Sequence, residues 1–124
     1  MRFGKIVFTV AGIWGLLVLT PLFFTEHKFG QDYPPAITHP EFFYGFVCVA
    51  VAWQVAFLII GRDPVRYRPL MIACMMEKFL FVIACIVLYL QGRLTGPILG
   101  GSAADFLLGI LFVVAYLKTG TTTA

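Results

Sequence analysis

Four long apolar runs occupy most of this sequence and decide what it can fold into. They cover residues 6–24, 42–60, 70–90 and 97–117. An α-helix rises about 1.5 Å per residue, so roughly 20 apolar residues cross a bilayer core of about 30 Å. Each run is therefore expected to form a transmembrane helix. The first run is longer than the apolar region of a secretory signal, so we interpret it as a retained span.

The composition agrees with a membrane protein. Hydrophobic residues make up 60% of the chain and charged residues 12%, whereas about a quarter of the residues in soluble domains are charged. Four spans leave little of the 124 residues for anything else. The predicted fold is all-α: a single integral membrane domain over residues 1–124, built as a four-transmembrane-helix up-and-down bundle with one longer loop between the first two spans.

Turn and cap residues lie between the predicted spans. Gly61 is expected to end the second span, and Asp63 with Pro64 to begin the third as cap and first helical residue. Gly92 follows the third run at a position where glycine commonly ends a helix.

The basic residues predict the orientation. Six of them lie before the first span, between the second and third, or after the fourth, and two lie on the other side. The six are Arg2, Lys5, Arg62, Arg66, Arg68 and Lys118, and the two are Lys28 and Arg93. Because lysine and arginine concentrate in cytoplasmic loops, both the N and C termini are expected to be cytoplasmic.

Polar residues inside the spans are the candidates for function. Glu77 and Lys78 interrupt the third run, and Asp105 interrupts the fourth. Counted at 1.5 Å per residue, Glu77 lies roughly 10 Å from the cytoplasmic end of its span, and Asp105 about 8 Å higher. The same count brings three further residues to the level of Glu77: Trp14, Trp53 and Gln54. These six residues are expected to form one polar layer.

Helical spacing predicts which way the charged residues face. Glu77 shares a stripe with Ala73 and Ala84, and small residues allow a neighbouring helix to approach closely. Asp105 is flanked in the same way by glycines four residues away on either side. Both acids are therefore expected to point into the bundle. Lys78 lies about 100° round the helix from Glu77.

Two interpretations of the layer remain open. In the first, Lys78 pairs with Glu77 or Asp105 and fixes the helix register. In the second, the layer is a ligand site or a proton relay. Two acids face one base, so one carboxylate is left over and must be protonated, hydrated or bound to a ligand.

Other chemistry is not indicated. The two histidines, His27 and His39, fall in the loop after the first span without the helical spacing of metal ligands, so no metal site is expected. The sequence has no phosphate-binding loop or nucleophile motif, and we expect no cofactor and assign no catalytic residue.

A resemblance adds to this interpretation. It rests on HPEFFYGFV at 39–47, RDPVRYRPLM at 62–71, the Glu77 and Lys78 pair, LYLQGR at 88–93 and ADFLLGILFVVAYLKT at 104–119. In these segments the chain resembles bacterial four-helix membrane proteins of the DoxX-like group. The resemblance implies a helical bundle, multi-pass in the bacterial cytoplasmic (inner) membrane, and implies little about activity.

Three classes of function follow. The first expectation is a structural or accessory subunit of a membrane complex. The alternative is a small-molecule binder or transporter that uses the polar layer. An enzyme acting on a lipid or quinone is disfavoured. A single carboxylate can act as an acid or a base, but the sequence offers no second residue to complete a catalytic pair. The expected partners are membrane lipids, a homo-oligomer or larger membrane complex, and a small apolar or cationic ligand; nucleic acid is not expected.

Overall fold

A computed structural model describes residues 2–120 of the chain, and these residues are helical apart from short connections. The elements are α1 (Arg2–Leu19), a 3₁₀ helix η1 (Thr20–Phe24), α2 (Glu26–Asp32), α3 (Pro40–Arg62), α4 (Leu70–Leu90) and α5 (Gly96–Gly120). Four of them, α1 with η1, α3, α4 and α5, are long and apolar enough to cross a membrane. The predicted all-α class with four candidate spans is confirmed.

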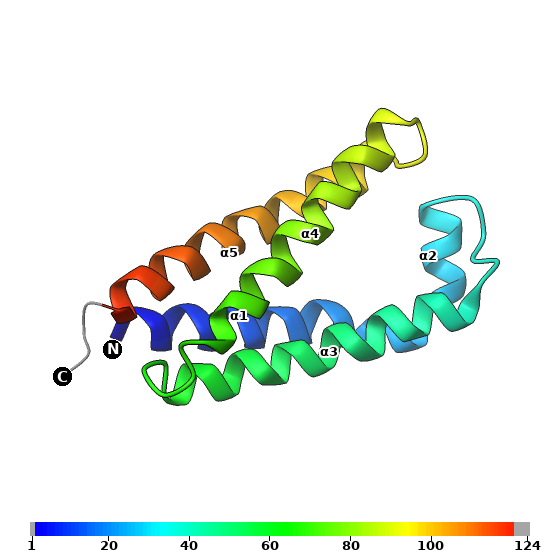
Figure 1. Ribbon diagram of the computed structural model, residues 1–124. Helices are drawn as coiled ribbons and strands as arrows, with labels where there is room; N and C mark the ends of the chain where they lie inside the picture. The colour runs from blue at the N-terminus through cyan, green and yellow to red at the C-terminus, as the bar shows by residue number, and fades with distance from the viewer. Residues whose placement is uncertain (1, 121–124) are drawn as a thin grey trace.

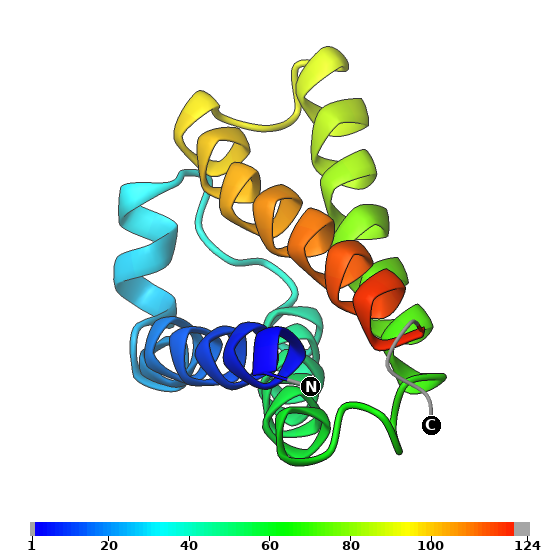
Figure 2. The ribbon, with the colours of Figure 1, turned by 90° about the vertical axis from the view of Figure 1, so that its left-hand side faces the viewer.

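The four long helices form two antiparallel pairs. α1 packs mainly against α3, and α4 packs mainly against α5, whereas α3 and α4 scarcely touch. Figure 1 shows the pairs together at the end that holds the start of α1 and the end of α5, and separating toward the end that holds α2. The view in Figure 2 shows the same separation between the α1–α3 and α4–α5 pairs.

Aromatic side chains pack the two helix pairs together at the end of the molecule that holds the start of α1 and the end of α5. The Phe8 ring of α1 stacks on the Phe112 ring of α5, with centroids 4.4 Å apart, and Phe57 of α3 meets Phe112 edge-on at 5.0 Å. All three side chains are fully buried. Such offset and edge-to-face contacts add to the burial of apolar area. The packed core thus lies at one end of the molecule, and the two helix pairs are apart at the other end.

Glycines set the close approach of α1 to α3. A Cβ atom added to Gly12 would come within 2.8 Å of the Gln54 carbonyl oxygen, and one added to Gly61 would lie 2.5 Å from Thr9 Oγ1. The expectation that Gly61 ends the second span is therefore wrong: α3 continues to Arg62, and Gly61 is needed inside the helix, where α1 crosses it.

The connection between α3 and α4 also differs from the prediction. Residues 64–69 form turns, and α4 begins only at Leu70. Asp63 caps these turns rather than α4, because the Arg66 backbone N–H donates to Asp63 Oδ1 at 3.3 Å. At the other end of α4, Gly92 has a φ of +72°, in the left-handed region that glycine adopts most easily.

A short helix was not anticipated in the loop after the first span. α2 fills part of that loop, with an exposed ion pair of 3.0 Å between Lys28 and Asp32 one turn apart. His27 contacts Gln31 on the same helix, and His39 Nδ1 lies 3.0 Å from Glu41 Oε1 at the start of α3.

Candidate functional site

A cavity of about 450 Å³ lies where the two helix pairs separate. Its walls come from α3 and α4, with single residues from α1 and α5. The lining residues are Leu19, Gly45, Phe46, Val49, Ala50, Trp53, Gln54, Glu77, Lys78, Phe81 and Asp105. The walls are mostly apolar, with the charged side chains gathered on the α4–α5 side. This combination is typical of sites that bind small organic molecules.

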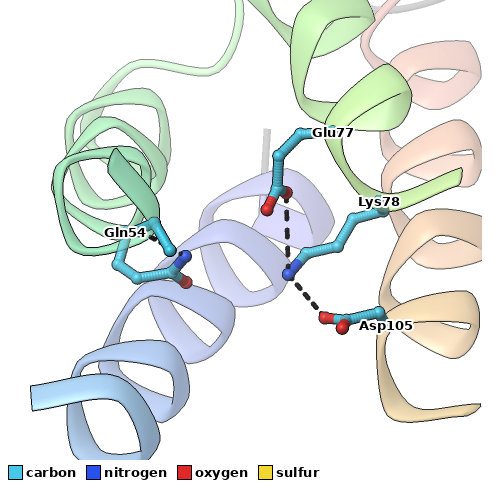
Figure 3. A network of polar contacts seen from close by, with 5 residues as sticks. Gln54, Glu77, Lys78 and Asp105 are labelled. Atoms are coloured by element: carbon cyan, nitrogen blue, oxygen red, sulfur yellow. Dashed lines mark hydrogen bonds and ion pairs between the residues drawn. The ribbon is translucent and has the colours of Figure 1, made fainter. Parts of the chain in front are cut away.

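Lys78 is the centre of the charged group. Its ammonium donates a hydrogen bond of 2.8 Å to Asp105 Oδ1 and lies 3.7 Å from Glu77 Oε2 (Figure 3). The shorter contact is a charge-assisted hydrogen bond, while the longer one is too long for a hydrogen bond and leaves only electrostatic attraction. Asp105 is therefore the partner of Lys78, and Glu77 is the additional acid.

Burial differs sharply among the three charged residues. The Lys78 side chain is only 6% exposed, whereas the side chains of Glu77 and Asp105 are 27% and 29% exposed. The Lys78 ammonium also lies 5.4 Å from the centroid of the Phe57 ring, which belongs to the aromatic core. A lysine buried in this way requires its carboxylate partner, because a lone charge inside a membrane protein is costly.

The buried face of α4 is not the one predicted from small residues. That face consists of Met71, Cys74, Lys78, Val82 and Cys85. Ala84, which shares the stripe of Glu77, is exposed. The expectation that the Glu77 stripe is the helix contact is wrong; Lys78 lies on the contact face and Glu77 lies at its edge, beside the cavity. Pairing with Asp105 explains how α4 accommodates a lysine on its contact face.

Close contact between α4 and α5 brings Asp105 to Lys78. A Cβ atom added to Gly109, one turn after Asp105, would lie 2.9 Å from the Phe79 ring and 3.3 Å from Lys78 Cβ. On the other side of Asp105, a Cβ atom added to Gly101 would meet nothing within 4 Å. Of the two glycines flanking Asp105, only Gly109 is a packing position.

Gln54 forms part of the opposite wall. It is 2% exposed, and its Nε2 donates a hydrogen bond of 2.8 Å to the Ala50 carbonyl oxygen within α3. The side-chain amide packs directly over Gly15 of α1, where any side chain would collide with it. Figure 3 shows Gln54 on α3, across the cavity from the charged group on α4 and α5.

The two tryptophans occupy different places. Trp53 lines the cavity, whereas Trp14 is 52% exposed and lies outside the cavity. α1 buries Ala11, Gly12 and Gly15 against its neighbours, and Trp14 lies to the side of that face. The structure thus brings together Gln54, Trp53, Glu77, Lys78 and Asp105 of the six residues nominated from the sequence, and places Trp14 apart from them.

The apolar half of the cavity was missed by sequence reasoning. It includes Gly45, Phe46, Val49 and Phe81, which in sequence look like any lipid-facing residues of a span. The rings of Phe46 and Phe81 are stacked across the gap between α3 and α4 with centroids 6.3 Å apart. The one available signal was Gly45, a glycine within an aromatic-rich run.

In comparisons with known proteins, no family model matches this sequence, and no curated protein or solved structure matches it.

Proposed function

We propose that this protein is a membrane-embedded binding protein for a small, membrane-soluble molecule, which it holds as a receptor or carrier. The observation that supports this is the cavity of about 450 Å³ between α3 and α4, with apolar walls and one charged side. Sites for small molecules commonly enclose about 300–1,000 Å³ and use a few placed polar groups to orient the ligand.

The charged group supports binding better than a purely structural role. Lys78 and Asp105 already form a neutral pair that would hold α4 and α5 in register. Glu77 adds a second carboxylate on the cavity side, and a structural pair does not need it. Ionisable residues inside membrane spans are costly and therefore commonly serve a function.

The other two classes of function are less well supported. An accessory subunit would need a helix face for its partner but no cavity, so the cavity and its charged wall would be left without a role. An enzyme acting on a lipid or quinone would need a second catalytic group beside Glu77. Lys78 and Asp105 are engaged with each other, which leaves Glu77 alone for such chemistry.

We also propose that both termini face the cytoplasm of a bacterial cell, with the protein in its inner membrane. The start of α1, the end of α5 and the turn between α3 and α4 share one end of the molecule (Figure 1). The six basic residues counted from the sequence therefore gather at that end, where positive charge favours the cytoplasmic side. A relationship to the DoxX-like group, which we infer from the sequence segments alone, would imply the same location.

Cysteine labelling tests this orientation. We expect Gln31→Cys in α2 and Thr95→Cys before α5 to react with a membrane-impermeant maleimide on intact cells, since both residues are exposed on the side proposed to be periplasmic. Val65→Cys, in the turn before α4, should react only after the cells are opened. The reverse pattern would show that the orientation is inverted.

Filling the cavity tests the binding function. A Cβ atom added to Gly45 meets nothing within 4 Å, so Gly45→Leu should fill part of the cavity without disturbing the fold. Gly100→Leu is the matched control, because Gly100 is equally open but lies outside the cavity. We expect native mass spectrometry of protein released from nanodiscs to detect a bound small molecule on wild type and Gly100→Leu, and on Gly45→Leu at least about tenfold less.

Equal occupancy of wild type and Gly45→Leu, or no bound molecule on either, would contradict the proposed function. Circular dichroism of the two variants checks that each is folded. Since both changes replace a helical glycine by leucine, their effects on helix propensity are the same, and any difference between them arises from the cavity.

A further inference from the structure

We propose that the ligand of the cavity carries a protonated amine, whose N–H groups bind the Glu77 carboxylate while its apolar part packs against Phe46 and Phe81. This inference rests on the proposed binding function and adds the chemical class of the ligand. It comes from the charge balance, the hydrogen-bonding state of Glu77 and the chemistry of the walls.

The charge balance favours a cation. Two carboxylates and one ammonium meet at the cavity, and the ammonium lies closer to Asp105 than to Glu77. With the Lys78–Asp105 pair neutral, the remaining charge on this wall is the negative charge of Glu77. A cationic group bound there would complete the neutralisation of the cluster, whereas an anionic ligand would face a carboxylate in a medium of low dielectric constant.

The hydrogen-bonding state of Glu77 favours a cation that has N–H groups. Within the described residues, Glu77 Oε2 is the one buried side-chain nitrogen or oxygen atom that has no hydrogen-bond partner. Lys78 does not supply one, because its ammonium is 3.7 Å from that oxygen. Oε2 itself is enclosed by the protein, whereas the Glu77 side chain as a whole is 27% exposed and lines the cavity, so a ligand would bind the exposed part of this carboxylate. An ammonium N–H is the donor that also brings the missing charge. A quaternary ammonium brings the charge without the donor.

The walls suit the rest of such a molecule. Phe46 and Phe81 stack at 6.3 Å across the gap between α3 and α4, and Trp53 lies on the same α3 wall. Aromatic faces attract cations as well as apolar groups. Gly45 and Val49 continue the apolar surface away from Glu77. The cavity therefore presents one anionic end and an apolar body, which matches an amphiphile with an amine head.

The two tryptophans provide a direct test. They are the only two in the chain. In the Trp14→Phe variant, the remaining Trp53 reports quencher bound in the cavity. In the Trp53→Phe variant, the remaining Trp14 reports quencher that is dissolved in the surrounding bilayer. The probes are an alkylamine carrying a nitroxide quencher and three analogues in which a hydroxyl, a carboxylate or a quaternary ammonium replaces the amine. Each is titrated into the single-tryptophan protein in nanodiscs.

We expect saturable quenching of Trp53 by the amine, in excess of the Trp14 quenching, with an affinity at least about tenfold higher than that of the hydroxyl analogue. The quaternary ammonium should bind more weakly than the amine, and the carboxylate should not saturate. In the Trp14→Phe background, Glu77→Gln should reduce the affinity for the amine about tenfold or more and leave that for the hydroxyl analogue nearly unchanged.

The possible failures are distinguishable. Saturable quenching with equal affinity for the amine and hydroxyl probes would overturn the amine inference while supporting a binding cavity. Quenching of Trp53 that never exceeds that of Trp14, with every probe, would overturn both this inference and the proposed function. If Glu77→Gln does not fold, the relative affinities of the four probes for the protein that retains Glu77 still test the amine inference.

Discussion

Lys78→Met is expected to destabilise the protein by about 3–5 kcal/mol, because it strands the Asp105 carboxylate beside Glu77 with no cation to neutralise either acid. The double variant Lys78→Met with Asp105→Asn should recover most of that loss, since replacing both members of a buried ion pair is often close to neutral. Glu77→Gln should cost less than about 1 kcal/mol, as Glu77 makes no hydrogen bond to Lys78. Thermal unfolding in detergent compares the three variants with wild type.

This series separates the two possible partners of Lys78. The distances of 2.8 Å to Asp105 and 3.7 Å to Glu77 predict strong coupling to the first and weak coupling to the second. The double variant Lys78→Met with Glu77→Gln is the matched comparison, and it should recover much less stability than Lys78→Met with Asp105→Asn, because Asp105 stays charged without its partner. Recovery with Glu77→Gln rather than Asp105→Asn would show that Lys78 relies on Glu77 in the membrane.

Gly109→Leu should also lower stability strongly. Even a Cβ atom at position 109 would lie 2.9 Å from the Phe79 ring, so a leucine has to push α4 and α5 apart. Overpacking of this kind costs about 1–3 kcal/mol, and separation of the helices would weaken the Lys78–Asp105 bond as well. Melting temperature measured in nanodiscs gives the size of the effect.

Gly100→Leu controls for the chemistry of that substitution. Gly100 lies on the same helix but faces open space, so a leucine there should be neutral or slightly stabilising. Equal melting temperatures for the two variants would mean that Gly109 does not lie at a helix contact, and the placement of Asp105 next to Lys78 would fall with it.

The four long helices of this protein were predictable from its sequence, because the lengths of the apolar runs and the bilayer thickness determine them. The pairing of the helices was not. Gly12 and Gly61 look like ordinary glycines of a span until α1 is seen crossing α3 at those positions. The cavity arises from the separation of two helix pairs, and no sequence pattern records such a separation.

The polar half of the site was predictable and the apolar half was not. Glu77, Lys78 and Asp105 stand out because charge is rare in a span, and counting along the helices brought them to similar depths. Which acid pairs with Lys78 depended on the face of α4 that meets α5, and small residues near Glu77 suggested the wrong face. Phe46 and Phe81 carry no signal, since a bilayer and a cavity both favour aromatic side chains.

The grouping of the long helices into consecutive pairs has a consequence for how the chain enters the membrane. Lys78 on α4 and Asp105 on α5 belong to the same helical hairpin, joined by the short connection around Gly92. If that hairpin leaves the translocation channel as one unit, the lysine and the aspartate cross into lipid already paired. A charge inserted alone at mid-membrane costs about 2.5–3.5 kcal/mol on translocon scales, so pairing during synthesis would ease the entry of both helices.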